Sequence, residues 1–525
     1  MKKIFLFVLT VCLCVAVANA QQKATANFGY DKDIILEEGN DYVRMIGGDS
    51  DGFFAIRMDA EDKLWLEYFN AASLVRESSA QIILPVVDGN QTEYVESFYV
   101  DGQVVLFTQV EDFLKKEKLL YIQELGKSGQ VMGEPRVIGK LTNQNMSADF
   151  NVCLTPNGQN MFVWYNRPFQ TYNEEPFYFK MYNSNLREVY NKQIKLPLVN
   201  QAFAIEDIKI TNSGCVYMLV RISPTEAQLQ KMKIITYDYK MLVFNPAMED
   251  VTTFDVKDKK LVLVDAIFGI DDNDNIDVYG FLVPKGKTTY QAIFHQKYDV
   301  KEKKPVNARD SKKAIYTFQK TEIPAFNADR LNWIMDQKYD YQLLNVLYLS
   351  DGGSVVVAEH KNYKKDSIFD PQTRETIFNE YYRFNDVLVA YCSPLNNMEW
   401  MVRIPKSQYS WNDYGKYSSV ATYAIGEKVF LFYNDNAKNL TNLEAGESKA
   451  NLNGDKYKEA TSPDRNGFAI AVSIFSDGAV SGQALFPKSN KKSKIIPELF
   501  QEYNGTHYMF TRNGKKCKFA MFNPE

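Results

Sequence analysis

The amino-acid sequence predicts an all-β protein, and three observations support this fold class. Short runs of Val, Ile, Phe and Tyr are separated by Asn, Asp and Gly, which is the pattern of strands joined by turns. Apolar residues at helical spacing are scarce. A polar turn followed by an apolar strand recurs along the chain, and such recurrence indicates a repeat architecture.

The repeat is marked by eight turns containing Gly, Asn or Asp, residues that adopt positive φ at low cost. One predicted strand precedes each turn, a second follows it directly, and two more come after. The second strands, such as 161–165 and 355–357, are apolar on both faces, as expected where sheets pack face to face. The turns are Asp51-Gly52, Asp101-Gly102, Asn157-Gly158, Asn212-Ser213-Gly214, Asp272-Asn273-Asp274-Asn275, Asp351-Gly352-Gly353, Gly426 and Asn504-Gly505.

Four strands per unit, arranged radially, predict a single β-propeller of about eight four-stranded blades. Seven blades are the alternative, if one unit is irregular. The last unit supplies strands at 496–503, 507–512 and 517–522, and segment 33–36 would complete its blade as the outer strand. The N- and C-terminal strands are therefore expected to share a blade and close the ring.

Residues 1–20 have the features of a secretory signal peptide. Lys2 and Lys3 precede an apolar stretch, and Ala18-Asn19-Ala20 is a suitable cleavage site. Residues 21–525 would then form one exported propeller domain, with no later apolar run long enough for a transmembrane helix. The formal net charge of −4 lacks the basic excess of a nucleic-acid-binding protein.

Four cysteines follow the signal segment and lie far apart in the sequence. Export permits disulfides, but so few cysteines do not form a disulfide scaffold, and we expect buried free thiols. Their disulfide state stays open at this point, and no cofactor is expected. The cysteines are Cys153, Cys215, Cys392 and Cys517.

The long connections all fall on the face opposite the tight turns, if strands alternate in direction as predicted. Long connections on a rigid scaffold commonly carry the binding function. They are residues 166–176, 223–231, 318–341, 361–376, 408–417 and 434–466.

Two of these connections, 166–176 and 408–417, carry aromatic and polar side chains that suit a sugar or a protein partner equally. Packing among the connections would explain the same residues without a ligand. Trp333 lies in a predicted short helix, where it is either an exposed anchor or a packing contact. The ligand-binding candidates are Arg167, Phe169, Tyr172, Glu174, Trp333, Tyr409, Trp411, Asp413 and Tyr414.

Carboxylates around the central channel would instead support acid–base catalysis, as in a glycosidase or lyase. Glu206, Asp207, Asp265 and Glu498 lie on predicted innermost strands. No metal centre is expected, because the three histidines lack ligand spacing. A weak calcium candidate is the turn with Asp271, Asn273, Asn275 and Asp277, where Ile276 replaces the glycine of a calcium loop.

The whole mature chain resembles the uncharacterised exported β-propeller proteins of gut Gram-negative bacteria of the Bacteroides type. The resemblance rests on the signal MKKIFLFVLTVCLCVAVANAQ, the Asn-, Asp-, Tyr- and Lys-rich composition and the turn repeats. It implies a location in the periplasm or at the outer-membrane surface, and it implies no catalytic residues. Asp366-Ser367-Ile368 is similar to the O-glycosylation signal of such bacteria, which implies a modified Ser367.

The sequence therefore favours a non-enzymatic scaffold that binds a protein or glycan of the cell envelope through its long-connection face. The alternative is a carbohydrate-active enzyme with carboxylates at the central channel. The oligomeric state is left open.

Overall fold

The structure is a computed structural model of the 525-residue chain. The helices in the part of the chain that it describes are too short or too polar to span a bilayer. The described residues are 26–28, 33–142, 148–166, 176–198, 202–230, 236–285, 291–307, 314–318, 340–370, 372, 374–439, 459–461, 463, 467–486, 492–503 and 505–522.

The described residues are mostly strands, as the sequence predicts, and the first four large sheets are regular and antiparallel. Each runs from one strand to the next in chain order. The first contains β3 (Asp41–Gly48), β4 (Gly52–Met58), β5 (Leu64–Asn70) and β6 (Arg76–Gln81). The second contains β9 (Glu93–Val100), β10 (Gln103–Asp112), β11 (Glu117–Leu125) and β12 (Val131–Thr142). The third contains β13 (Asn151–Leu154), β14 (Asn160–Asn166), β15 (Pro176–Asn183) and β16 (Glu188–Lys195). The fourth contains β17 (Phe203–Ile210), β18 (Val216–Ile222), β19 (Asp238–Asn245) and β20 (Asp250–Val256).

Of the next four sheets, the seventh keeps this plan with four strands, and the fifth, sixth and eighth have additional short strands. The fifth contains β21 (Val262–Ile270), β22 (Ile276–Val283), β23 (Ala292–Asp299), β24 (Lys304–Val306) and β25 (Ile315–Thr317). The sixth contains β26 (Asp340–Tyr348), β27 (Ser354–Asp370), β28 (Glu375–Cys392), β29 (Met398–Ile404), β30 (Gln408–Trp411) and β33 (Ala460–Thr461). The seventh contains β31 (Ala421–Ile425), β32 (Lys428–Asn436), β34 (Gly467–Ile474) and β35 (Val480–Ala484). The eighth contains β1 (Ala26–Phe28), β2 (Ile34–Ile35), β36 (Lys494–Ile495), β37 (Gln501–Tyr503), β38 (Thr506–Asn513) and β39 (Lys516–Phe522).

Small elements outside this plan include the hairpin of β7 (Val86–Val87) and β8 (Asn90–Gln91), the helix α1 (Glu226–Leu229) and the 3-10 helix η5 (Pro497–Leu499).

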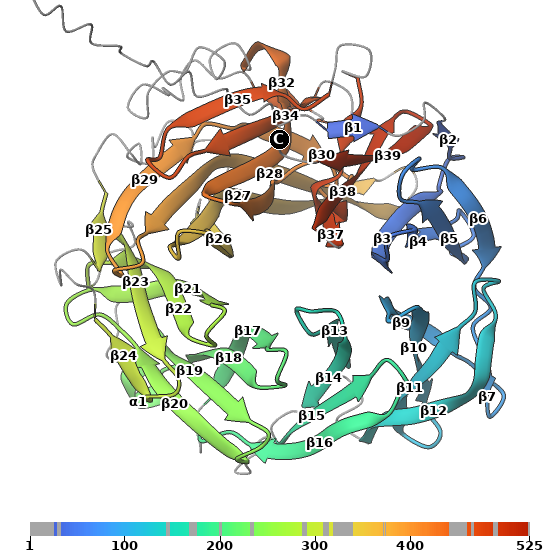
Figure 1. Ribbon diagram of the computed structural model, residues 1–525, viewed down its shortest axis with the longest axis horizontal. Coiled ribbons are helices and arrows are strands. Elements are labelled where there is room, and N and C mark those ends of the chain that lie inside the picture. The colour runs from blue at the N-terminus through green and yellow to red at the C-terminus, as the bar shows by residue number, and fades with distance from the viewer. Residues whose placement is uncertain are drawn as a thin grey trace, which may run out of the picture.

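The sheets stand around a common centre, which is the arrangement of a β-propeller (Figure 1). Strands such as β3, β9, β17 and β26 lie innermost, and β6, β12 and β16 lie at the rim. Each of the eight predicted turns joins an inner strand to its antiparallel second strand. The second strands are buried along most of their length, as β22 shows at every position. The prediction of turns and second strands is therefore confirmed.

The hydrophobic core lies between the sheets. The described residues form eight apolar clusters, and each cluster draws its side chains from two sheets that are consecutive in the chain or from the last and the first. The cluster joining the eighth sheet to the first includes Phe53 and Phe69 from one side and Phe510 and Phe519 from the other. Because both faces of each sheet are buried, each sheet packs against two neighbouring sheets.

The two ends of the described chain pair in one sheet. Ile34 lies opposite Cys517, and Ala26 lies opposite Phe522, so both β1 and β2 extend β39. This confirms the prediction that segment 33–36 pairs with the last unit. Segment 496–503, expected as one strand, is instead η5 followed by β37, because Pro497 has no N–H to donate to a ladder.

We predict that deleting residues 516–525 unfolds the whole protein cooperatively. This deletion removes β39, whose side chains belong to two of the apolar clusters, Phe519 to one and Phe522 to the other. Circular dichroism during urea titration would measure the loss. Deleting only residues 523–525 keeps β39 and is the control. Retention of a native-like transition by the longer deletion, with fraying confined to the chain end, would contradict the prediction.

Among the predicted connections that contain regular structure, 361–376 and 408–417 lie closest to the candidate site described below. Residues 361–376, expected as a loop, continue β27 and enter β28, so that a two-stranded ribbon projects from the sixth sheet. Residues 408–411 of the expected loop 408–417 form β30, which pairs with β28. We use "ribbon" for residues 361–370 and 375–384. The polar side chains of the ribbon suggested a loop. Its regular structure is explained by the backbone hydrogen bonds between two long strands.

Candidate functional site

A pocket of about 510 Å³ lies at the base of the ribbon. Its lining comes from the sixth sheet, the start of the seventh sheet, the connection between these two sheets, and η5. The lining residues of β26 and β31 lie at the ends of these inner strands opposite the tight turns. The pocket therefore lies on the face of the long connections. Its lining residues are Gln342, Leu344, Asn345, Lys361, Asn362, Tyr363, Tyr382, Phe384, Tyr414, Gly415, Ser419, Val420, Thr422, Pro497 and Glu498.

Aromatic rings form one side of the pocket. Tyr363 and Tyr382 lie opposite each other in the ribbon, with ring centroids 5.2 Å apart. Phe384 follows at the next position on the same face of β28. Gly415 packs against this group, and a Cβ there would come within 2.9 Å of the Phe384 ring. A side chain larger than hydrogen at position 415 would push these rings apart.

The connection after β30 places Tyr414 at the mouth of the pocket. Asn412, Tyr414 and Ser419 all have positive φ, at 52°, 57° and 69°. Such conformations cost of order 1 kcal/mol each or more outside glycine, and they persist where surrounding contacts hold them. The backbone N–H of Asn412 donates to the Glu380 carbonyl at 2.9 Å, and the Glu380 N–H donates to Asn412 Oδ1 at 2.8 Å. Tyr414 is 84% exposed and is therefore available to a ligand.

A buried ionic cluster supports the floor of the pocket. Glu359, at the start of the ribbon, accepts hydrogen bonds from Lys406 Nζ at 2.5 Å and from Ser419 Oγ at 2.6 Å. Lys406 Nζ also donates to Gln408 Oε1 at 2.8 Å. Burial lowers the pKa of Lys406, and the Glu359 carboxylate opposes this shift. Lys361 pairs with Glu359 at 3.4 Å and presents its partly exposed side chain to the pocket.

The structure places the ligand-binding candidates of connection 408–417 on different surfaces. Only Tyr414 lines the pocket. Trp411 lies opposite Tyr381 and Tyr409 lies opposite Arg383, so both side chains occupy the other face of the ribbon. Asp413 accepts the Gly415 N–H at 2.9 Å and shapes the turn. The structure therefore does not bring these four residues together on one surface, and ligand binding by them stays a prediction. Arg167, Phe169, Tyr172, Glu174 and Trp333 lie outside the described residues.

The predicted channel carboxylates do not converge. Glu206 pairs with Arg221, and Asp207 pairs with Lys209 at 3.6 Å. Asp265 accepts the Leu343 N–H at 3.3 Å. Glu498 lies on η5 rather than on a strand, and it is the only one of these four acids that lines the pocket.

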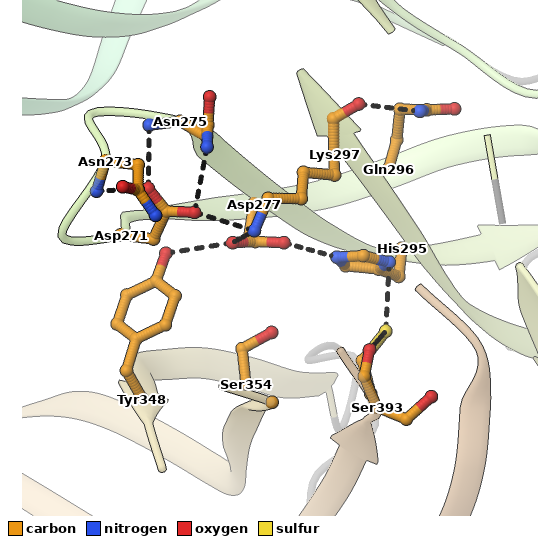
Figure 2. Close-up of polar contacts among 12 residues, drawn as sticks. Asp271, Asn273, Asn275, Asp277, His295, Gln296, Lys297, Tyr348, Ser354 and Ser393 are labelled. Carbon is orange, nitrogen blue, oxygen red and sulfur yellow. Dashed lines mark hydrogen bonds and ion pairs between the residues drawn. The ribbon is translucent and has the colours of Figure 1, made fainter. Parts of the chain in front are cut away.

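The weak calcium candidate lies in a turn held by its own hydrogen bonds (Figure 2). Asp271 accepts the N–H groups of Asn273 and Asn275, each at 2.9 Å. The Lys297 ammonium stands between Asp271 at 2.7 Å and Asp277 at 3.4 Å, so a protein cation already pairs with both carboxylates. Among the described residues, no group of three or more His, Cys, Asp or Glu side chains is arranged to hold a metal ion.

Beside this turn lies a series of three side chains in the order of a nucleophile, a base and an acid, namely Cys392, His295 and Asp277. His295 Nδ1 lies 3.2 Å from the Cys392 thiol, and its Nε2 lies 2.8 Å from Asp277 (Figure 2). All three residues are at least 98% buried, and burial raises the pKa of the Cys392 thiol. A protonated and inaccessible thiol is not a nucleophile. The group joins the fifth sheet to the sixth.

The four cysteines are free thiols, as expected. Cys392 and Cys517 are buried, and Cys153 and Cys215 are half-buried rather than buried. Ser367 is exposed, but it lies in β27 rather than in the expected loop. The modification itself stays a prediction.

Sequence reasoning missed Tyr363, Tyr382 and Phe384, although the ribbon brings them together. The signal was present as aromatic residues at alternate positions, which share one face of a strand.

The chain matches no protein-family model. It also matches none of the curated proteins. Among solved structures, an ulvan lyase of a new polysaccharide lyase family is 7% identical, with a TM-score of 0.35 over 86% of this chain and 96% of that one. The β-propeller domain of a trilobed protease from Pyrococcus furiosus is 10% identical, with a TM-score of 0.33 over 87% and 98%. An α-L-arabinanase from Penicillium chrysogenum is 10% identical, with a TM-score of 0.31 over 62% and 94%. Similarity at this level assigns the chain to no family and to no activity.

Proposed function

We propose that this chain is an exported, non-enzymatic protein that binds a glycan of the cell envelope in the pocket at the base of the ribbon. The observation that carries the proposal is the lining of that pocket. Tyr363, Tyr382 and Tyr414 offer aromatic faces for the C–H surface of a sugar. Amide side chains, such as Gln342 and Asn345, offer partners for its hydroxyl groups.

We propose that the pocket is held by a single closed propeller of eight blades. Its support is the set of eight apolar clusters, one of which packs the last sheet on the first, and the pairing of β39 with β1 and β2. A rigid ring of this kind would hold the elements that line the pocket in fixed positions.

The size and charge of the pocket favour a neutral glycan over a protein partner. About 510 Å³ is within the range of small-molecule sites. A stable protein–protein interface instead covers roughly 800 Å² on each partner. The lining carries one lysine and one glutamate, Lys361 and Glu498, so it offers no excess of either charge.

The same lining favours binding over hydrolysis. Most glycosidases place two carboxyl groups on either side of the bond that they cleave. Among the lining residues, which are all described, Glu498 is the only carboxylic acid. The proposal of export rests on the signal pattern of residues 1–20, and it places the protein in the periplasm or at the outer-membrane surface.

We predict that Tyr414→Ala weakens glycan binding about ten-fold or more, because an exposed ring at the mouth of the pocket would be a major contact. A panel of neutral gluco-, xylo-, manno- and galacto-oligosaccharides, followed by calorimetry on the best binder, would measure the effect. Tyr414→Phe keeps the ring and should keep most of the affinity.

Trp411→Ala is the matched control, because it removes an exposed ring from the other face of the ribbon. It should leave glycan affinity unchanged. Equal losses from Trp411→Ala and Tyr414→Ala would contradict a pocket-centred site. Release of reducing sugar during the incubation would contradict the non-enzymatic assignment and favour the carbohydrate-active enzyme.

A further inference from the structure

The ribbon has two different faces, and its register assigns each side chain to one of them. Directly opposed residues in an antiparallel pair share a face, and alternate residues along a strand do too. Lys361 lies opposite Phe384, and Tyr363 lies opposite Tyr382. The next opposed pairs on this face are Lys365 with Glu380, Ser367 with Phe378, and Phe369 with Thr376.

This face continues the lining of the pocket out to the tip of the ribbon. Tyr363, Tyr382 and Phe384 belong to both surfaces. Phe369 and Phe378 extend the series, and they are 62% and 56% exposed. We name this set of five the aromatic stripe. The eight residue steps from 361 to 369 span roughly 27 Å at the rise of a strand.

Polar groups lie between the rings of the aromatic stripe. Glu380 accepts hydrogen bonds from the hydroxyls of Tyr363 at 3.0 Å and Tyr382 at 2.5 Å. Lys365 Nζ lies 3.3 Å from Glu380 and 4.9 Å from the centre of the Phe378 ring. These contacts order the tyrosine rings before a ligand arrives, which reduces the entropy cost of binding.

The other face of the ribbon has a different character. Ile368 lies opposite Ile377 near its tip, and Tyr381 lies opposite Trp411 near its base. The isoleucines are 56% and 48% exposed, but their branched side chains have no flat surface on which a sugar ring could stack. Towards the tip of the ribbon, an extended glycan is therefore expected on the aromatic stripe rather than on the face of Ile368 and Ile377.

We propose that the aromatic stripe is an extension of the pocket and binds the remainder of a glycan chain whose end occupies the pocket. This inference rests on the proposed function, and it assigns the ligand to linear polysaccharides rather than to short sugars. The argument is the continuity of the stripe with the pocket and the alternation of rings with polar groups along it. A lipid surface suits the ribbon less well, because its turn carries Arg374 and Glu375 and its strand edges would enter the bilayer unpaired.

The experiment compares Phe369→Ala/Phe378→Ala with wild type, using disaccharides and long oligosaccharides of the gluco-, xylo-, manno- and galacto- series. Wild type should bind the long oligosaccharides more tightly than the disaccharides. The double variant should lose about ten-fold in affinity for the long ones and keep its affinity for the disaccharides. Ile368→Ala/Ile377→Ala removes apolar surface from the same part of the ribbon on the other face, and it should behave as wild type.

The outcomes separate this inference from the proposed function. Equal affinity of wild type for short and long oligosaccharides would overturn the extension and leave the pocket in place. Absence of binding to every oligosaccharide would overturn the proposed function together with the extension. Equal losses of oligosaccharide affinity in the two double variants would overturn the inference. Binding of wild type to phosphatidylglycerol vesicles, abolished in both double variants, would assign the tip to a lipid surface and would also overturn it.

Discussion

Replacing Glu359 by alanine is expected to lower the free energy of unfolding by about 3–5 kcal/mol, the usual cost of leaving a buried charge without its partner. The side chains of Glu359 and Lys406 are both fully buried, and their charged atoms lie 2.5 Å apart. In the variant, the Lys406 ammonium would keep only Gln408 and the Phe384 carbonyl as hydrogen-bond acceptors. Urea unfolding followed by circular dichroism would measure the loss.

Two further variants give this prediction its controls. Asp250→Ala breaks the exposed pair with Lys303 and should cost less than about 1 kcal/mol. The double variant Glu359→Leu/Lys406→Met removes both buried charges and should recover much of the stability lost by Glu359→Ala. A double variant that is less stable than Glu359→Ala would show that the buried ion pair is itself strongly stabilising, contrary to this account.

The same cluster connects stability to the candidate site. Ser419 donates to Glu359, and its backbone N–H donates to Gln408 Oε1 at 2.9 Å. Ser419 also lines the pocket and ends the connection that carries Tyr414. Loss of Glu359 is therefore expected to loosen the Tyr414 connection as well as the base of the ribbon.

The sequence was sufficient to predict the turns because their cause is local. Gly352 has a φ of 84° and Gly102 has a φ of 86°, values that side chains other than glycine rarely adopt. The second strands were equally clear, since burial on both faces requires an uninterrupted apolar run. Together these two signals predicted the repeat of sheets.

The ribbon could not be recognised in the same way. Lys364, Lys365 and Asp366 are solvated on both faces of a strand that has no core beneath it, so the stretch looks like a polar loop. Its order comes from pairing with residues that follow it in the chain, and composition does not encode that pairing. The missed pocket residues have the same explanation.

The buried cluster and the position of Tyr414 depend on contacts between distant residues. Glu359 and Lys406 are 47 positions apart, and each alone looks like an ordinary surface charge. Trp411 and Tyr414 are close in sequence, but positive φ at Asn412 turns the backbone between them. A sequence pattern therefore shows both aromatic residues without showing that only Tyr414 reaches the pocket.

The contribution of Asp435 to the stability of the protein is expected to fall as the pH rises from about 4 to about 7. This residue is fully buried near the end of β32. Its Oδ1 accepts hydrogen bonds from the Asn436 N–H at 2.7 Å and from Asn439 Nδ2 at 2.9 Å, while its buried Oδ2 has no hydrogen-bond partner among the described residues. Burial raises the pKa of Asp435 to about 7, against the weaker opposing effects of these hydrogen bonds and of the Lys406 charge.

The sign of the effect follows from proton binding. In the unfolded chain an aspartic acid loses its proton near pH 4, whereas folded Asp435 holds its proton until about pH 7. The folded state therefore binds more protons at this group in this window, and the contribution of Asp435 to stability decreases with pH there and levels off above it. Three pH units correspond to an upper bound of roughly 4 kcal/mol for this one group.

Asp435→Asn isolates this contribution, because asparagine keeps the shape of the side chain and does not titrate. Relative to wild type, the variant should become more stable as the pH increases from about 4 to about 7. Above about pH 7, the difference in unfolding free energy between the two proteins should stay constant. Other carboxylates titrate in the same range, but they are common to both proteins and cancel in the difference. A difference that is independent of pH would mean that Asp435 has the same pKa in the folded and unfolded chains, and burial at this position would then carry no electrostatic cost.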